Sequence, residues 1–332
     1  MTQVFLKPGF QKMTKMQSRL GATNFKDVLT SGKIDAGDFE FVDQIANLSL
    51  SPFELFSTKL NPLTEFVKQN VTNFRLVHIT ESSDEPIVIE VKKLVHTIVV
   101  VAENIKAQII FDGEDSCFAS AEIYLKKKAN LKVILLQLNC VEFNFSCFRT
   151  KLEAGARIEW FLNYFAITNA YSFVQNWLVG EQAKSDIHLV SASKANEVSD
   201  FFAGNCFDAK NCKGEIWAKG VAQGKSKMSF VGEIEITLKG GGTDSYLKED
   251  VLMLDATSKI EAVPSLEIKT NDVKAGHGVS IARLTDDKLF YLTSRGISTE
   301  EAKKLVLAGF LRDGFSKIKL PEIIAKLDAL ID

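Results

Sequence analysis

Hydrophobic and polar residues alternate through the middle of this chain. Residues Glu233 to Lys239 alternate strictly, and the segments that begin at Arg157 and Glu215 start in the same way. Period two with β-branched and aromatic residues is typical of a strand with one buried face. Proline, which lacks an N–H and is excluded from central strands, is absent from Ile87 to Val263. The pattern therefore predicts a long, mainly β body.

The strand-like segments also recur along the chain. Successive segments carry an isoleucine, and these isoleucines lie 25, 24, 29 and 29 residues apart: Ile109, Ile134, Ile158, Ile187 and Ile216. In a repeat protein one coil cannot bury its apolar face alone and stacks on the next. The spacing predicts a β-solenoid. A β-sandwich, with strands every 8–12 residues or so, is the alternative that the pattern leaves open.

Both ends of the chain are predicted to be helical. Ser51 and Pro52 are typical of a helix start. Ser298 to Glu301 forms a capping box. A helical face is predicted after it, followed by a second amphipathic helix from Leu320 to Ile331; the residues of the first face are Ala302, Leu305, Val306, Gly309 and Phe310. The predicted organisation is an N-terminal helical region over 1–75, a β-helix core over 76–283 and a C-terminal helical region over 284–332.

Composition argues against several classes of protein. Forty Lys and Arg against 42 Asp and Glu leave a net charge of −2, without the basic excess of a nucleic-acid binder. The longest apolar run, Ile98 to Ala102, has five residues, whereas a membrane-spanning helix needs ~20. Lysines interrupt the N-terminal residues, so no secretory signal is predicted. Five cysteines, an odd number, are expected to be free thiols in a reducing cytoplasm.

Two glycine-rich motifs are interpreted as turns. Gly220 to Ser226 looks like a phosphate-binding loop, but three residues instead of four separate its glycines and a strand-like segment follows. Gly240 to Gly242 is not followed by a helix. The cysteine pairs do not have zinc-site spacing. The sequence therefore gives no motif for binding a nucleotide or a zinc ion.

Two of the four histidines are candidates for a functional role. His96, just before the apolar run, is interpreted as structural. His277 stands between Gly276 and Gly278, which leave its imidazole little shielded. An exposed imidazole can bind a metal or carry a proton. The residues alone favour a turn histidine and leave the ligand role open.

The C-terminal third resembles the SufB/SufD family. The matching elements follow one another in order from Phe230 to about Phe310: Phe230–Ile234, Thr243–Tyr246, Leu252–Leu254, Pro264–Ile268, Asp272–Lys274, His277–Gly278, Leu289–Ser298 and Glu301–Ala302. The resemblance implies a right-handed parallel β-helix with helical ends. It also implies a non-ATPase subunit of the SUF iron–sulfur cluster assembly machine, in which SufB pairs with SufD and both dock SufC, an ABC-type ATPase.

Within that family the chain looks like SufD. SufB members tend to have Glu where this chain has Gly278, and they carry a cysteine in the segment that corresponds to Leu252–Pro264, where this chain has none. The resemblance makes His277 a candidate iron or cluster ligand at the interface with a SufB-like subunit. Many SufD members have cysteine at the position of Ala275, so a thiolate would come mainly from the partner.

The resemblance also implies a docking surface for SufC in the C-terminal helical region. The candidate residues are Leu289, Phe290, Tyr291, Arg295, Gly296 and Phe310. No tightly bound cofactor is expected, iron or an Fe–S cluster would be transient cargo, and no flavin site can be placed. The chain is predicted to be a cytoplasmic, non-catalytic scaffold without nucleic-acid or membrane partners. A homodimer, a β-helix enzyme acting on polysaccharide and a purely structural solenoid are the alternatives left open.

Overall fold

The computed structural model describes residues 48, 50, 53–57, 62–71, 73–91, 95–113, 118–138, 144–165, 169–254, 256–316 and a few positions up to 328. Sixteen strands and four helices lie within these residues. The helices are α4 (Glu54–Ser57), α5 (Pro62–Asn70), α6 (Asp286–Ser294) and α7 (Thr299–Phe315). The strands are β1 (Asn73–Ile79), β2 (Ile87–Glu90), β3 (Val95–Val101), β4 (Lys106–Asp112), β5 (Phe118–Leu125), β6 (Asn130–Leu138), β7 (Asn144–Leu152), β8 (Arg157–Phe165), β9 (Asn169–Leu178), β10 (Lys184–Ser193), β11 (Val198–Phe207), β12 (Lys213–Ala222), β13 (Lys227–Ile236), β14 (Thr243–Met253), β15 (Lys259–Ile268) and β16 (Val273–Arg283).

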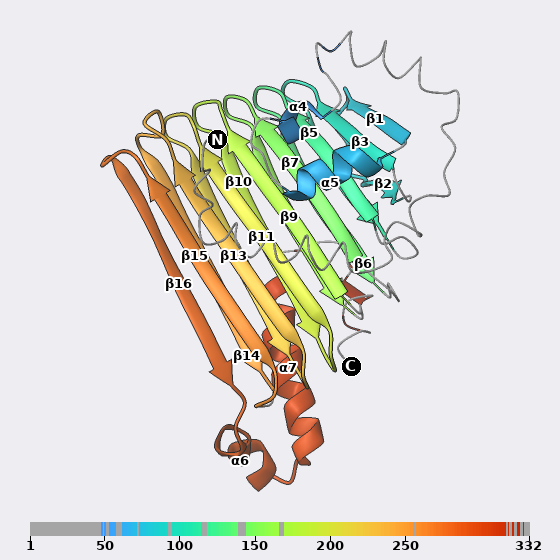
Figure 1. The fold of residues 1–332 in the computed structure, drawn as a ribbon, viewed down its shortest axis with the longest axis vertical. Helices are drawn as coiled ribbons and strands as arrows, with labels where there is room; N and C mark the ends of the chain where they lie inside the picture. The colour runs from blue at the N-terminus through green and yellow to red at the C-terminus, as the bar shows by residue number, and fades with distance from the viewer. Residues whose placement is uncertain are drawn as a thin grey trace, which may run out of the picture.

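The strands form two parallel sheets of eight. One sheet contains the odd-numbered strands in the order β1 to β15, and the other contains the even-numbered strands from β16 back to β2 (Figure 1). Consecutive strands therefore alternate between the sheets, and each strand pairs with the one two positions further along the chain. This is a parallel β-solenoid, which confirms the predicted fold class and excludes the sandwich.

The register of the even sheet shows how far the isoleucine repeat was correct. Residues that pair in register on neighbouring strands form a row across the sheet, called a rank below. One inward-facing rank ends in the last strand and consists of Ile109, Val133, Trp160, Ile187, Ile216, Leu247 and His277. Ile134 instead pairs with Phe161 and lies on the outer face, and Ile158 pairs with Leu131. Equivalent residues lie 24 to 31 positions apart because the turns differ in length. The repeat was therefore real, but its alignment was wrong at two coils.

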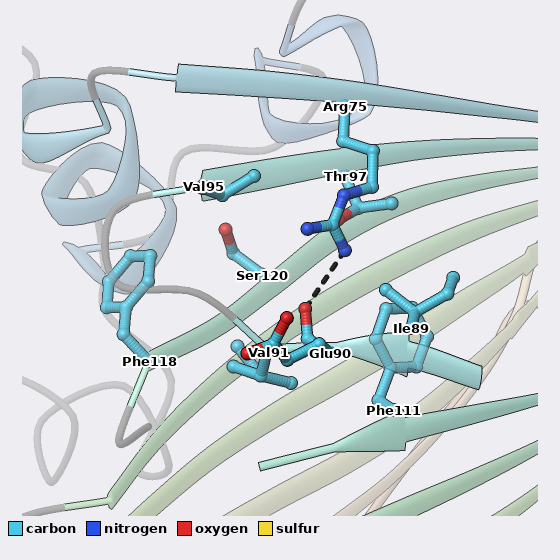
Figure 2. A pocket seen from close by; sticks show the side chains of 10 residues that line it. Arg75, Ile89, Glu90, Val91, Val95, Thr97, Phe111, Phe118 and Ser120 are labelled. Atoms are coloured by element: carbon cyan, nitrogen blue, oxygen red, sulfur yellow. Dashed lines mark hydrogen bonds between the residues drawn. The ribbon is translucent and has the colours of Figure 1, made fainter. Parts of the chain in front are cut away.

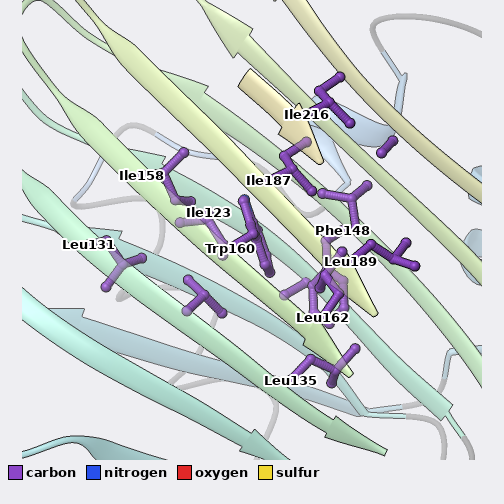
Figure 3. Packing of buried hydrophobic residues seen from close by; sticks show 14 of the residues in the cluster. Ile123, Leu131, Leu135, Phe148, Ile158, Trp160, Leu162, Ile187, Leu189 and Ile216 are labelled. Atoms are coloured by element: carbon purple, nitrogen blue, oxygen red, sulfur yellow. The ribbon is translucent and has the colours of Figure 1, made fainter. Parts of the chain in front are cut away.

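The core lies between the two sheets. Apolar side chains from both inner faces meet there, and Figure 3 shows Trp160 and Phe148 in the middle of the cluster with isoleucines and leucines around them. Their ring centroids are 5.1 Å apart. Burial of such apolar area is the main stabilising contribution to a fold of this kind.

A short polar network crosses this core. Asn176 accepts a hydrogen bond from the Trp160 indole at 3.2 Å and donates to Ser185 at 2.9 Å and to Asn205 at 3.2 Å. The Tyr164 hydroxyl lies 2.7 Å from the Ser146 hydroxyl and donates to Ser172 at 2.6 Å. Buried polar groups are tolerated when they are paired in this way.

One proline lies inside the predicted β-helix core. Pro264 sits in the middle of β15 and pairs with Gly232, so the ladder continues beyond the proline-free stretch that ends at Val263. Proline is tolerated there because β15 is an edge strand, with a single neighbour in its sheet. Both glycine-rich motifs are turns, as predicted: β12 ends at Ala222 and β13 follows from Lys227, while residues 240–242 join β13 to β14.

The helices pack on opposite faces of the solenoid. Helices α4 and α5 contact β7 of the odd sheet, and α7 contacts β10 and β12 of the even sheet (Figure 1). Ser51, Pro52 and most of the predicted helix 320–331 lie outside the described residues. Strand β1 begins at Asn73 and α6 at Asp286, and the predicted division into three regions stays a prediction.

The capping box of α7 is confirmed, and only part of the predicted helical face is turned toward the solenoid. Ser298 accepts a hydrogen bond from the Glu301 backbone at 3.3 Å, and the Glu301 carboxylate accepts one from the Ser298 backbone at 3.1 Å. Ala302 of this face is buried, whereas Leu305 and Gly309 are exposed, and Ala308 and Leu311 outside the predicted face are buried. The rotation of the helix is set by its contacts with the even sheet, which its own sequence does not encode.

Candidate functional site at the last coil

The last coil of the solenoid, β15 and β16, leaves two strand edges without a described neighbour. Each strand pairs on one side only, β15 with β13 and β16 with β14. Apolar side chains on this coil are exposed, among them Ile268, Val279 and Ile281. An open strand edge presents backbone N–H and C=O groups that can pair with another chain. The geometry of this end therefore suits association through its strands.

His277 lies in the middle of β16, at the end of the inward-facing rank. It pairs with Leu247, whose side chain is fully buried, and it continues the same face beyond the last covered coil. Its imidazole is exposed, and no hydrogen bond or ion pair holds it within the described part of the chain. The interpretation as a turn histidine is wrong, because the residue belongs to a strand. Ala275, on the same face, offers no ligand atom.

Glu249 is an inward-facing acidic residue on the strand next to His277, and it was missed at the sequence level. It lies on β14 two residues after Leu247 and is 1% exposed. Gly232 on the facing strand makes room for it, since a Cβ there would come 3.0 Å from Glu249 Oε1. Burial raises the pKa of Glu249 to about 7, although a hydrogen bond from the Gly232 backbone N–H acts to lower that pKa. The signal was an acidic residue at an inward position of a period-two pattern.

The Oε2 atom of Glu249 is buried and has no hydrogen-bond partner among the described residues. A buried carboxyl of this kind is held in its neutral form at low pH and is destabilising once ionised. It stands one strand away from His277. The last two coils thus combine an exposed imidazole with a buried carboxyl that has one oxygen without a partner among the described residues.

The six predicted docking residues divide into two groups. Leu289 is buried and Phe310 half-buried, and both pack on the cluster between α7 and the even sheet. The Lys219 ammonium lies 4.8 Å from the centroid of the Phe310 ring and pairs with Asp313. These two residues therefore fix the helices to the solenoid.

The other docking residues face solvent on α6 and the turn after it. Phe290 is 69% exposed and Tyr291 65% exposed. The Arg295 guanidinium lies 5.4 Å from the centroid of the Tyr291 ring, and Gly296 has the positive φ of +88° that the turn into α7 requires. Figure 1 shows α6 beyond the end of β16, clear of both sheets. These residues form an aromatic and cationic patch available for contact.

A buried charged cluster that the sequence analysis missed lies on the outer face of the odd sheet. The Glu122 carboxylate accepts hydrogen bonds from the backbone N–H groups of Phe53, Leu55 and Phe56 at 2.9, 2.5 and 3.1 Å. The Arg149 guanidinium donates to the Leu55 carbonyl at 2.7 Å. The cluster anchors α4 to the sheet, which is a structural role.

The remaining histidine and cysteine candidates do not form a functional site among the described residues. His96 is fully buried, with Nδ1 3.0 Å from the Ser120 hydroxyl, as its structural interpretation predicted. Cys147, Cys206 and Cys212 are buried free thiols, while Cys117 and Cys140 lie outside the described residues. No group of three metal-ligating side chains occurs in the part of the chain that the structure describes. No helix among the described residues is long and apolar enough to cross a bilayer.

A small cavity at the first coils is also a weak candidate. Its lining is mostly apolar, and Arg75 reaches across it to donate a hydrogen bond to the Glu90 carbonyl at 2.9 Å (Figure 2). That contact links β1 to the end of β2, so Arg75 ties together the two sheets. The last coil and α6 therefore stand as the candidate functional regions.

The fold is that of the parallel β-solenoid proteins, here with an open last coil and a helical C-terminal part. Comparison with known proteins identifies the family. Residues 82–310 match the family model described as SUF system FeS cluster assembly, SufBD core domain. This chain belongs to the SufBD family.

The relatives it resembles carry the same family description. An iron–sulfur cluster assembly SufBD family protein of Mycobacterium bovis is 28% identical over 225 residues, which cover 67% of this chain and 26% of the relative. One from Galdieria sulphuraria is 27% identical over 192 residues, covering 58% of this chain and 81% of the relative. A second Mycobacterium bovis relative is 36% identical over 130 residues, 37% of this chain and 33% of its own length. The chain thus matches about a quarter of the length of the first relative.

Proposed function

We propose that this chain is a SufD-like, non-catalytic subunit of a cytoplasmic SUF complex that assembles iron–sulfur clusters. The observation that carries the proposal is the open last coil, which presents His277 from the middle of an edge strand. Membership in the SufBD family favours this function over a polysaccharide-active enzyme or a purely structural solenoid. Iron and sulfide would be the cargo, and no tightly bound cofactor is part of the proposal.

The partner at the open end would be a SufB-like chain. Strand β16 offers an eleven-residue edge without proline. In β15, by contrast, Pro264 lacks a backbone N–H and interrupts the row of hydrogen-bond donors. Exposed Val279 and Ile281 would be covered when strands pair there. Since neither Ala275 nor the segment 252–264 supplies a thiol, the partner would contribute thiolate and this chain the imidazole. Soft thiolates with an imidazole are a ligand set that iron–sulfur chemistry uses.

The ATPase partner SufC would dock on α6. Phe290, Tyr291 and Arg295 form an exposed patch, and aromatic residues with arginine are the types that dominate protein interfaces. Leu289 and Phe310 would support the patch from beneath. The turn at residues 223–226 is not a phosphate-binding loop, so nucleotide hydrolysis is assigned to the partner.

The ligand role of His277 is tested by His277→Ala in the complex with the SufB-like and SufC subunits. We expect the initial rate of cluster formation, followed by visible absorption and circular dichroism, to fall at least tenfold, the loss typical of a removed metal ligand or its support. The matched control is His78→Ala, because His78 is an exposed histidine on β1 at the opposite end. A normal rate in His277→Ala would contradict the proposal.

The docking surface is tested by pull-down with SufC. The double variant Phe290→Ala/Tyr291→Ala should lose roughly 2 kcal/mol of binding or more, as expected for exposed aromatic anchors. Leu238→Ala removes an equally exposed apolar side chain from a turn and should leave binding unchanged. Equal retention of SufC by all three proteins would show that docking lies elsewhere. Light scattering of the chain alone reports whether it forms a homodimer before the partner is added.

A further inference from the structure

Two glycines flank His277 in the edge strand, and their role is not backbone flexibility. Gly276 and Gly278 belong to β16, and neither has the positive φ that favours glycine elsewhere in this chain. Glycine weakens a strand because it has no side chain to pack and loses more conformational entropy on folding than other residues do. An edge strand with a glycine on each side of its functional residue therefore needs another source of order.

Tyr246 on the neighbouring strand covers both glycines. It pairs in register with Gly276, and Lys248 pairs with Gly278. A Cβ at Gly276 would lie 3.3 Å from Tyr246 Cε2, and a Cβ at Gly278 would lie 2.8 Å from Tyr246 Oη. The ring therefore runs along the outer face of β16 from Gly276 to Gly278 and passes the backbone of His277. Any larger side chain at either position would displace it.

This arrangement has a known effect in sheets, where an aromatic side chain that covers a cross-strand glycine restores the order that the glycine removes. We propose that Tyr246 is the positioning residue for His277: it holds residues 276–278 in the strand and keeps the imidazole on the inner face. Because side chains alternate along a strand, a slip of one residue would turn His277 to the outer face. Tyr246 is 42% exposed, so its role is to cover the strand and not to fill the core.

The positioning role does not depend on the ligand role of His277, but its effect on cluster assembly rests on the proposed function. The two are therefore measured separately. Hydrogen exchange of the β16 amides and the rate at which diethyl pyrocarbonate modifies His277 report the position of the strand in the isolated full-length chain. Cluster formation in the complex reports the function.

In the isolated chain, Tyr246→Ala should accelerate exchange of residues 275–279 roughly tenfold, since exchange follows local opening, and should raise the modification rate of His277. Tyr246→Phe keeps the ring and should restore both to the wild-type level. Tyr291→Ala removes an exposed tyrosine from α6 and serves as the control. Unchanged exchange in Tyr246→Ala, or failure of Tyr246→Phe to restore it, overturns the proposal.

A second pair of variants uses a smaller change in case Tyr246→Ala does not fold. Gly278→Ala places a Cβ against Tyr246 Oη and should accelerate exchange of the same amides. In the Tyr246→Phe background, which lacks that oxygen, Gly278→Ala should have a smaller effect. Equal effects in both backgrounds would show that the glycine does not make room for the tyrosine and would contradict the proposal.

The complex separates the two claims. Tyr246→Ala should slow cluster formation and Tyr246→Phe should restore it. If His277→Ala leaves cluster formation normal while Tyr246→Ala still loosens β16, the proposed function fails and the positioning role stands. If His277→Ala abolishes cluster formation and Tyr246→Ala leaves β16 unchanged, the positioning role fails alone.

Discussion

Two buried glutamates lie in opposite surroundings. Glu122, on the outer face of the odd sheet, is 0% exposed, and its carboxylate accepts three hydrogen bonds from backbone N–H groups of residues 53–56. Glu249, on the inner face of the even sheet, is 1% exposed, and its Oε2 has no partner among the described residues. The comparison shows that burial alone does not say whether a charged group stabilises a fold, because its partners decide the sign.

The surroundings of Glu122 explain how charge is tolerated there. The Arg149 guanidinium lies 4.9 Å from the centroid of the Trp177 ring and 5.4 Å from that of Phe173. Burial lowers the pKa of Arg149 to about 10, while Glu122 opposes that shift. Burial also raises the pKa of the nearby Cys147 thiol to about 12, which makes it an inert residue at neutral pH. Around Glu249, by contrast, the neighbours are Leu247, Gly232 and other apolar core residues.

The largest effect is expected for Glu122→Ala. This change leaves the N–H groups of Phe53, Leu55 and Phe56 without their acceptor and removes the negative charge that favours the charged form of Arg149. Breaking a buried charged contact costs about 3–5 kcal/mol. Denaturant unfolding should show that loss, together with faster exchange of the α4 amides. Glu153→Ala removes a half-exposed partner of Lys126 and should cost at most about 1 kcal/mol. Similar losses of unfolding free energy in Glu122→Ala and Glu153→Ala would contradict the view that the partners of Glu122 make it stabilising.

A stabilising effect is expected for Glu249→Gln above neutral pH. In the folded chain the pKa of Glu249 is raised from 4.5 to about 7, so this group's full contribution to stability is present below about pH 4.5. It is lost as pH rises to about 7, because the unfolded chain ionises first. The variant should be more stable than wild type by up to roughly 3 kcal/mol at pH 8, and by much less at pH 4.

The measurement is denaturant unfolding across that pH range, compared between wild type and Glu249→Gln. The wild-type chain should lose stability with rising pH through this window relative to the variant. Identical pH profiles would mean that Glu249 is paired or solvated in solution. Glu153→Gln provides a control for removing one negative charge at the surface.

A smaller effect is expected for Gly232→Ala, which tests the space that Glu249 occupies. The added Cβ would lie 2.4 Å from Leu247 Cδ1 and 3.0 Å from Glu249 Oε1. Overpacking of this kind costs about 1–3 kcal/mol. Part of that loss should disappear in the Glu249→Ala background, where the carboxyl is gone. Strict additivity in this double-mutant cycle would show that the two residues do not share one space.

The capping box and the proline-free strand pattern were predicted correctly because each depends on residues close together in sequence. The period-two segments formed strands of one parallel solenoid, and Ser298 and Glu301 formed reciprocal hydrogen bonds. His96 was correctly interpreted as structural, although its contact with Ser120 spans 24 residues. The resemblance to the SufB/SufD family was also correct, since its ordered motifs lie within the matched residues 82–310.

The errors concern relations between distant segments. Ile134 and Ile158 were assigned to the wrong rank because turn lengths vary from coil to coil. The sequence left open which side of α7 is buried, and contacts with the even sheet bury Ala308 and Leu311 and leave Leu305 exposed. His277 was favoured as a turn residue because glycines usually mark turns, whereas here they admit the Tyr246 ring. Glu122 and Arg149 were overlooked because their partners lie 66 to 94 residues away.

By itself, the order of residues determined a mainly β body, its helical ends and the family, because alternation, caps and motifs act over a few neighbouring positions, and the family resemblance in turn favoured the solenoid over the sandwich. Only the tertiary structure decided which side chains share a rank and that His277 faces inward at an open end. It also decided that both carboxyl oxygens of Glu122 have partners, whereas the Oε2 atom of Glu249 has none among the described residues. Those properties depend on how coils stack, and stacking is set by packing and hydrogen bonding between strands about 30 residues apart.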